Sequence, residues 1–147
     1  MYLVSACLAG IPCRYDGKSC LHPAIAELVQ HGNAIPVCPE QLGGLSTPRP
    51  CSEITAQVNE TPKVMSIDGK DLTKAFIDGA EKALQIAKEN GIQKAILKSK
   101  SPSCGCGCIY DGTFTGKTME GNGITAQLLL ANGIKVLTEM DISKFEI

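Results

Sequence analysis

The sequence predicts an α/β fold: a parallel, Rossmann-like sheet with helices on both faces. Three segments each repeat a helical stretch, a turn that contains Gly beside Asn, and a short apolar run. The apolar runs are nearly continuous, as expected for strands whose two faces are both buried. The length of 147 residues suits one hydrophobic core. We therefore expect a single domain that spans residues 1–147.

The first helix and the first two strands follow directly from the N-terminus. Residues 2–6 are apolar and form the opening strand. Residues 23–30 have the apolar spacing of a helix, and Pro23 suits its first turn. A His-Gly-Asn turn at 31–33 ends this helix, and residues 34–38 follow as the second strand.

Two further helix–strand repeats complete the predicted sheet. Residues 71–89 place their apolar side chains on one stripe, and Asn90-Gly91 suits a left-handed helix end. The strand 94–98 follows this turn. The last helix spans 124–131, and the last strand follows at 134–137. Strands that alternate with helices in this way favour a parallel sheet.

One segment, residues 39–62, breaks the alternation of helices and strands. It contains four prolines and a Gly-Gly pair and shows little periodicity. Long loops inside compact domains are often lids or binding loops. The alternative is a meandering connection that includes a short strand at 52–58.

Composition narrows the class of protein. A formal net charge of −1 makes nucleic acid an unlikely partner, because nonspecific binding to nucleic acid needs a basic face. The N-terminus lacks the basic region of a secretory signal, and no apolar run approaches the ~18 residues of a membrane span. We therefore expect a cytoplasmic protein without a membrane partner. In that reducing compartment, 8 cysteines indicate metal ligands or reactive thiols rather than disulfides.

Three cysteines lie where parallel strands end. Cys7 follows the first strand, Cys38 closes the second, and Cys104 lies in the loop after strand 94–98. Because ligands gather at the carboxyl ends of parallel strands, we expect these three thiols to converge. The chain has no Cys-x-x-Cys pair, so zinc ribbons and thioredoxin-like chemistry are disfavoured. Three thiolates would hold an iron–sulfur cluster and leave one iron open to a substrate.

The other cysteines have several interpretations. Cys106 and Cys108 could supply a fourth ligand or carry a persulfide, although small loop residues beside flexible glycines are the simpler interpretation. Cys13, Cys20 and Cys51 are expected to be incidental.

Polar side chains near the three cysteines suggest catalytic roles. Glu40 follows Cys38 by two residues and is a candidate for proton transfer, unless it simply faces solvent at the start of a loop. Ser101 and Ser103 precede Cys104, where their hydroxyls would either bind substrate or cap a turn.

Four charged residues are candidates for substrate binding. Arg14 and Arg49 each offer a planar donor for an anion or a carbonyl oxygen. A structural pair between Arg14 and Asp16 is as probable as a role of either in substrate binding. Lys100 directly precedes Ser101, although lysines near this strand also suit a solvated edge.

Three ordered blocks of sequence resemble a known family. The blocks resemble the small bacterial family, long labelled a domain of unknown function, that includes the thiouracil desulfidases. They are Val4-Ser5-Ala6-Cys7-Leu8-Ala9-Gly10 with Arg14-Tyr15-Asp16-Gly17; Val37-Cys38-Pro39-Glu40 with Gly43-Gly44-Leu45 and Thr47-Pro48-Arg49; and Lys98-Ser99-Lys100-Ser101-Pro102-Ser103-Cys104-Gly105 with Tyr110-Asp111-Gly112-Thr113-Phe114.

The resemblance implies a cofactor, a reaction and roles for several residues. A 4Fe-4S cluster would be held by Cys7, Cys38 and Cys104, and its fourth iron would take the sulfur of thiouracil or a related thiolated nucleobase or nucleoside. Water replaces sulfur at carbon without redox change. Glu40 would transfer protons, and Ser101 or Ser103 would position the substrate. The thiols of Cys13, Cys106 and Cys108 lie outside the family pattern and leave a different ligation or sulfur-handling role open.

Other functions remain compatible with the residues. A non-catalytic cluster or metal-binding protein would place four protein thiolates on the metal. A sulfurtransferase would carry a cysteine persulfide on Cys106 or Cys108 and would work without iron. The neutral charge counts against an accessory domain that acts on thiolated tRNA. No feature of the sequence indicates an oligomeric state.

Overall fold

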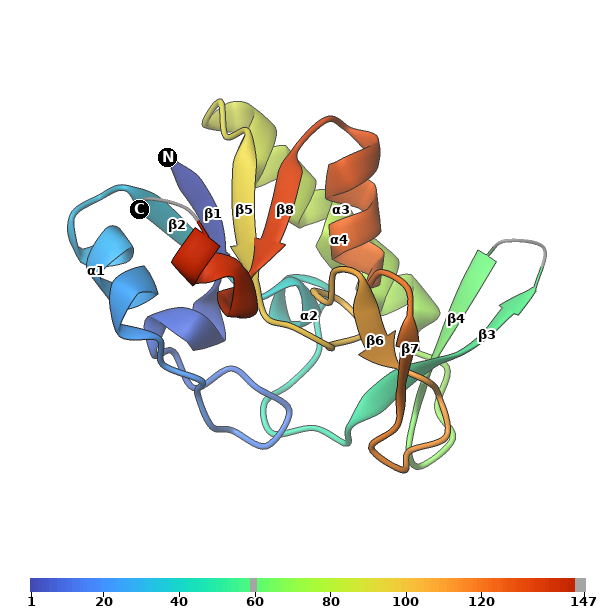
Figure 1. Ribbon diagram of the computed structural model, residues 1–147. Coiled ribbons are helices and arrows are strands. Elements are labelled where there is room, and N and C mark those ends of the chain that lie inside the picture. The colour runs from blue at the N-terminus through green and yellow to red at the C-terminus, as the bar shows by residue number, and fades with distance from the viewer. Residues whose placement is uncertain (59–60, 145–147) are drawn as a thin grey trace.

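A parallel sheet forms the centre of the molecule in the computed structural model, which describes residues 1–58 and 61–144 (Figure 1). Its strand order is β2-β1-β5-β8, so the first strand lies inside the sheet and the second lies at one edge. All three pairings are parallel. The four strands are β1 (Tyr2–Ser5), β2 (Ala34–Val37), β5 (Lys94–Leu97) and β8 (Lys135–Thr138).

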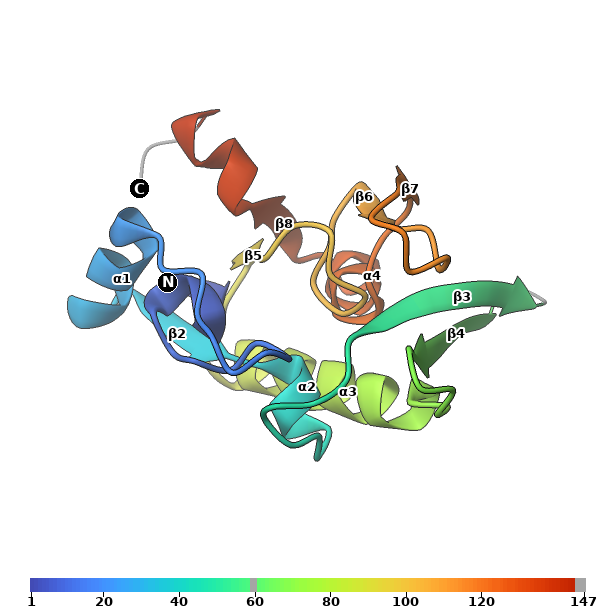
Figure 2. The ribbon, with the colours of Figure 1, turned by 90° about the horizontal axis from the view of Figure 1, so that it is seen from below.

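Helices cover both faces of this sheet (Figure 2). The long helix α3 (Thr73–Glu89) and α4 (Ile124–Ala131) pack on the face that carries Leu3 and Leu97. On the other face, Val4 packs against α1. This alternation of neighbouring side chains buries both faces of the strands and explains their apolar sequence. The face covered by α1 also carries the short helices; the elements there are α1 (Pro23–Gln30), η1 (Ala6–Ala9) and η2 (Glu139–Lys144).

The predicted α/β fold and its repeats are confirmed. The helices predicted at 23–30 and 124–131 have those bounds in the structure. The long helix begins at Thr73 rather than Asp71. Asp71 instead pairs with Met65 in an isolated bridge, and its carboxylate accepts the backbone N–H of Thr73. Among the described residues, no helix has the length and apolar character needed to cross a membrane.

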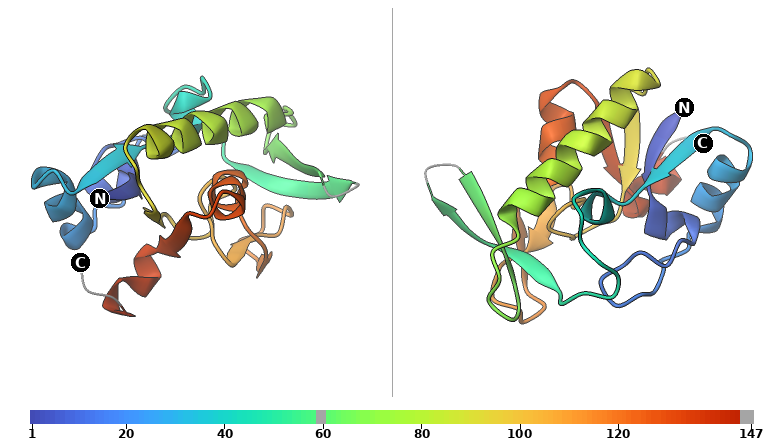
Figure 3. Two further views of the ribbon diagram at one scale, coloured as in Figure 1. Left: turned by 90° about the horizontal axis from the view of Figure 1, so that it is seen from above. Right: turned by 180° about the vertical axis from the view of Figure 1, so that it is seen from behind.

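The segment 39–62 contains more regular structure than its sequence indicates. It starts with the one-turn helix α2 (Pro39–Leu42) and continues into β3 (Ser52–Val58), which confirms the strand predicted there. This strand forms an antiparallel hairpin with β4 (Thr61–Ser66), and the hairpin extends from the body of the molecule (Figure 3). Residues 59 and 60 lie outside the described residues.

A second small hairpin occurs in the sequence between the last two strands of the parallel sheet, β5 and β8. It pairs β6 (Cys108–Tyr110) with β7 (Thr118–Glu120). An isolated bridge between Lys100 and Ile109 connects this hairpin to the loop that follows β5. The hairpin therefore lies beside the end of the sheet where the strands β1, β2 and β5 end.

Two glycines let α2 approach α3 closely. A Cβ atom at Gly79 would lie 2.8 Å from the carbonyl carbon of Pro39, and one at Gly43 would lie 2.9 Å from the carbonyl carbon of Ala75. The two helices therefore meet backbone against backbone, which fixes the position of the turn that begins at Cys38.

Candidate functional site

A cavity of about 240 Å³ lies at the carboxyl ends of the parallel strands. Small-molecule pockets start at about 300 Å³, so this cavity is near the size that a small ligand needs. Cys7, Cys38 and Cys104 all line it. Cys7 belongs to the short helix after β1, Cys38 directly follows β2, and Cys104 lies in the loop after β5. The expected convergence of the three thiols is therefore present.

Two more thiols, those of Cys13 and Cys51, also line the cavity. Cys13 is only 2% exposed and packs with Cys7 on the face of the sheet that α1 covers. The Cys38 thiol donates to the backbone carbonyl of Cys13 over 3.8 Å. The structure thus places Cys13 and Cys51 among the cavity thiols, whereas the sequence suggested that both are incidental.

Three of the cavity thiols, those of Cys13, Cys38 and Cys104, have a raised pKa, which favours their protonated form. Burial raises the pKa of the Cys104 thiol to about 12. The hydrogen bond with Cys13 and burial together raise the pKa of Cys38. The Cys38 thiol acts to lower the pKa of Cys13, but the Cys7 thiol and burial outweigh it and raise that pKa to about 11. Metal binding at these thiols would therefore have to release protons.

The donor set fits a multi-iron cluster. Cys thiolates are the usual ligands of iron–sulfur clusters, and each thiolate binds a different iron. Such ligands stand around a volume rather than around one point. Within the described residues, no three His, Cys, Asp or Glu side chains surround a point where a single metal ion would sit. Three thiols from three separate segments line one cavity, and thiol ligands of this kind suit an iron–sulfur cluster.

Glu40 is held beside these thiols by a buried arginine. Arg49 is only 5% exposed, and its Nε lies 3.4 Å from the Glu40 carboxylate. Its remaining nitrogens donate to the carbonyl oxygens of Ser46 and Cys13 and to the hydroxyl of Thr47. Burial raises the pKa of Glu40 above its ordinary value, and the charge of Arg49 partly opposes this shift. The cavity therefore contains a carboxyl group whose pKa is shifted in the direction that suits proton transfer.

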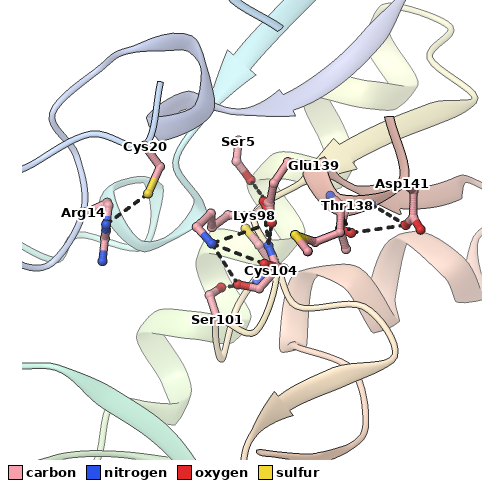
Figure 4. Close-up of polar contacts among 11 residues, drawn as sticks. Ser5, Arg14, Cys20, Lys98, Ser101, Cys104, Thr138, Glu139 and Asp141 are labelled. Carbon is pink, nitrogen blue, oxygen red and sulfur yellow. Dashed lines mark hydrogen bonds and ion pairs between the residues drawn. The ribbon is translucent and has the colours of Figure 1, made fainter. Parts of the chain in front are cut away.

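The two candidate serines occupy different environments. Ser101 lines the cavity, and its hydroxyl accepts the backbone N–H of Cys104 over 2.7 Å (Figure 4). Ser103 is fully buried, and its hydroxyl pairs with that of Thr125 over 2.7 Å. Ser101 thus shapes the turn that carries Cys104, whereas Ser103 connects that turn to α4.

The predicted substrate-binding residues are only partly brought together. Arg14 lines the cavity and donates to the Cys20 sulfur over 3.0 Å, as Figure 4 shows. Asp16 lies 3.9 Å from Arg14 and accepts the backbone N–H of Lys18. Asp16, Arg49 and the exposed Lys100 are not among the residues that line the cavity. Their roles in substrate binding stay predictions.

Comparison with known proteins identifies the family. A family model described as 2-thiouracil desulfurase matches residues 2–141. The chain belongs to this family. It is 45% identical over 148 residues to the uncharacterized protein YbbK of Bacillus subtilis (strain 168), which covers 97% of this chain and 98% of YbbK.

A solved structure of the family has the same fold. This structure, the 4Fe-4S-dependent thiouracil desulfidase TudS, has a TM-score of 0.89 and 43% sequence identity. The match covers 97% of this chain and 93% of TudS. The resemblance to the thiouracil desulfidase family, identified from three sequence blocks, is therefore confirmed.

Several residues of this desulfurase-family cavity were missed by sequence reasoning. Lys98 lines the cavity and forms an ion pair with Glu139 over 3.6 Å (Figure 4). Its position at the end of β5 could have indicated it, by the same rule that identifies the cysteines. Tyr15, Tyr110 and Glu53 also line the cavity. They come from loops and hairpins, and no periodic pattern indicates their positions.

Proposed function

We propose that this protein is an iron–sulfur-dependent desulfidase that acts on 2-thiouracil or a related thiolated nucleobase or nucleoside. The reaction replaces the sulfur of the thiocarbonyl by the oxygen of water and releases hydrogen sulfide, without any change in oxidation state. The observation that carries the proposal is the convergence of three thiols on one cavity beside a half-buried carboxyl group. The family, and the activity named for TudS, support it.

Cys7, Cys38 and Cys104 are the ligands that we assign to a 4Fe-4S cluster. When bound through three thiolates, such a cluster supplies an iron that can act as a Lewis acid on the thiocarbonyl sulfur. Three different segments of chain carry the three ligands, so the fold of the sheet sets their spacing.

The protein's own polar groups handle the proton and the substrate. Glu40 takes a proton from the attacking water and returns one to the departing sulfur, for which its raised pKa is suited. Arg49 holds this carboxylate in one orientation. Tyr15 and Tyr110 offer aromatic faces at the cavity, on which a planar nucleobase can stack.

The proposed substrate is a small molecule, and the proposed location is the cytoplasm. The net charge of −1 supports a free base or nucleoside rather than a nucleic acid. All eight cysteines are free thiols, which supports a reducing compartment.

One observation favours a second candidate function, a non-catalytic cluster carrier. Cys13 lines the cavity and is buried like Cys7 and Cys104, and a fourth protein thiolate would leave no iron open to substrate. Cys106 and Cys108 do not line the described cavity, so the persulfide mechanism has less support. Replacing Cys13 by Ser separates the two functions, because only a four-thiolate carrier should lose iron with it.

The test is iron and acid-labile sulfide content, with the visible spectrum, after reconstitution without oxygen. About four irons per chain are expected. Single replacement of Cys7, Cys38 or Cys104 by Ser should lower the iron content, while Cys108→Ser, outside the cavity, should not.

Sulfide release from 2-thiouracil then tests catalysis. Glu40→Gln should keep the iron and lose turnover. No iron in the reconstituted wild type, or a single zinc ion, would disprove the cluster assignment. Full turnover in Glu40→Gln would remove Glu40 from its assigned role.

A further inference from the structure

The strand β3 carries a second buried carboxylate, that of Glu53, which the proposed mechanism does not use. Its side chain lines the cavity although the residue is only 8% exposed. One carboxylate oxygen, Oε1, accepts the backbone N–H of Gly112 over 2.9 Å and that of Phe114 over 3.2 Å. Carboxylates are rarely buried without compensating partners, so the environment of the other oxygen is informative.

The other oxygen of Glu53, Oε2, has no protein partner. Among the residues whose side chains the structure describes, neither a hydrogen-bond donor nor a cation pairs with it. Among the side chains that the structure describes, His22 Nδ1 is the one polar atom that is both fully enclosed and without a hydrogen-bond partner. Oε2 has no partner either, so it is not fully enclosed. Glu53 is among the residues that line the cavity, so the cavity is the space from which a ligand could reach Oε2. An ionised carboxylate has about four acceptor positions, and those of Oε2 are available to a ligand.

The turn at 111–116 holds this carboxylate rigidly. Gly112 and Phe114, which donate to Oε1, both have a positive φ, +89° and +58°. A Cβ atom at Gly112 would lie 2.6 Å from the carbonyl oxygen of Ile54, so the turn rests directly on β3. An acceptor fixed in this way needs little ordering when a ligand binds, which favours a role in orienting substrate.

We propose that Glu53 is a specificity-determining residue that accepts an N–H of the substrate ring beside the thiocarbonyl. This inference rests on the proposed function, since it concerns the substrate of the same site. In 2-thiouracil the carbon that bears sulfur lies between two ring N–H groups. A hydrogen bond from one of them to Oε2 would turn the sulfur in a defined direction. The site should therefore select thioamide-type rings that retain this N–H over rings that are alkylated at nitrogen.

Glu53→Gln is the variant that tests the role. Its amide oxygen can still accept from Gly112 and Phe114, so the turn stays in place, while its NH₂ group replaces Oε2 at the cavity. An acceptor thereby becomes a donor, and the substrate N–H loses its partner. Hydrogen bonds to charged groups contribute about 1.5–3 kcal/mol, which corresponds to a loss of about tenfold or more in affinity.

The measurement is calorimetric binding of uracil and 1,3-dimethyluracil to the reconstituted protein, together with sulfide release from 2-thiouracil. Uracil has the same ring N–H groups and does not react. Glu53→Gln should weaken uracil binding about tenfold or more and leave 1,3-dimethyluracil binding unchanged. KM for 2-thiouracil should rise by a similar factor at unchanged iron content.

Asp111→Asn is the matched control. Asp111 lies in the same turn, where its carboxylate accepts from Thr113, and it does not line the described cavity. This variant should bind both ligands as the wild type does. Equal weakening of both ligands by Glu53→Gln, a fall in its iron content, or unchanged uracil binding would each overturn the proposal. Failure of the wild type to release sulfide would instead refute the proposed function, while the uracil titration would still decide the role of Glu53.

Discussion

Replacing Gly79 by Ala in α3 sets two physical effects of opposite sign against each other. Ala is favoured over Gly in a helix interior by about 1 kcal/mol. Against this, the new Cβ atom would lie 2.8 Å from the carbonyl carbon of Pro39, and closer still to its oxygen. Carbon atoms prefer a separation of about 3.5–4.0 Å, so α2 would have to move away by roughly 1 Å.

The steric effect should dominate the stability of Gly79→Ala. Inserting a methyl group into a packed interior costs about 1–3 kcal/mol. The upper end applies here because the opposing atoms belong to the backbone and have no alternative rotamer. After subtracting the gain in helix propensity, the free energy of unfolding should fall by about 2 kcal/mol. Urea denaturation of the two proteins measures this difference.

The same substitution should also damage the site. Pro39 lies between Cys38 and Glu40, so a shift of α2 displaces together the proposed cluster ligand and the proposed proton-transfer residue. A misplacement of about 1 Å can cost about 100-fold in rate. We therefore expect lower iron content and sulfide release reduced by about that factor. Both are measured on protein reconstituted without oxygen.

Glu81→Ala provides the control, because it introduces Ala on the exposed side of the same helix. This variant should keep the stability and activity of the wild type. If Gly79→Ala were instead about 1 kcal/mol more stable than the wild type, with full iron content and turnover, the close contact between α2 and α3 would be refuted.

Three further predictions follow from contacts around the site. Ser103→Ala should lower the free energy of unfolding in urea by about 1–3 kcal/mol, because it leaves a buried threonine hydroxyl without its partner; unchanged stability would contradict this. Arg49→Lys should keep the iron but lower kcat for sulfide release about tenfold or more, since Lys cannot reproduce the planar donors that orient Glu40; wild-type kcat would exclude that role. Hydrogen bonds from the Thr73 side chain and backbone lower the pKa of Asp71, so its stabilisation is present above about pH 4 and is lost as the pH falls further. The difference in urea midpoint between the wild type and Asp71→Asn should disappear over that range, and a constant difference would contradict it.

The parallel sheet could be predicted because its sequence signals are local. Strands buried on both faces need continuous apolar residues, and amphipathic helices need a stripe with a period of 3.6. The second hairpin has neither signal: all three residues of β7 are exposed, and β6 has one buried residue, Ile109. Its position depends on contacts with the loop after β5, which are distant in sequence.

In the candidate site too, the residues with a local sequence signal could be predicted, and those placed by contacts distant in sequence could not. Cys7, Cys38 and Cys104 could be predicted to converge because the carboxyl ends of parallel strands meet at one edge. Cys13 could not, because it follows a 3₁₀ helix and a turn rather than a strand end. The pairing of Glu40 with Arg49 also depends on how an aperiodic segment folds back over the cavity.

The site thus has two parts, one carried by the ends of the parallel strands and one carried by the segment between α2 and β4. The proposed cluster ligands follow three neighbouring strands of the parallel sheet, β2, β1 and β5, whose spacing the sheet determines. Arg49 orients Glu40, and Glu53, by our proposal, orients the substrate. Both residues come from the segment between α2 and β4. Changes in that segment can therefore alter which ring is accepted without moving the thiols. Loss of substrate preference at unchanged iron content, as expected for Glu53→Gln, is the signature of that separation.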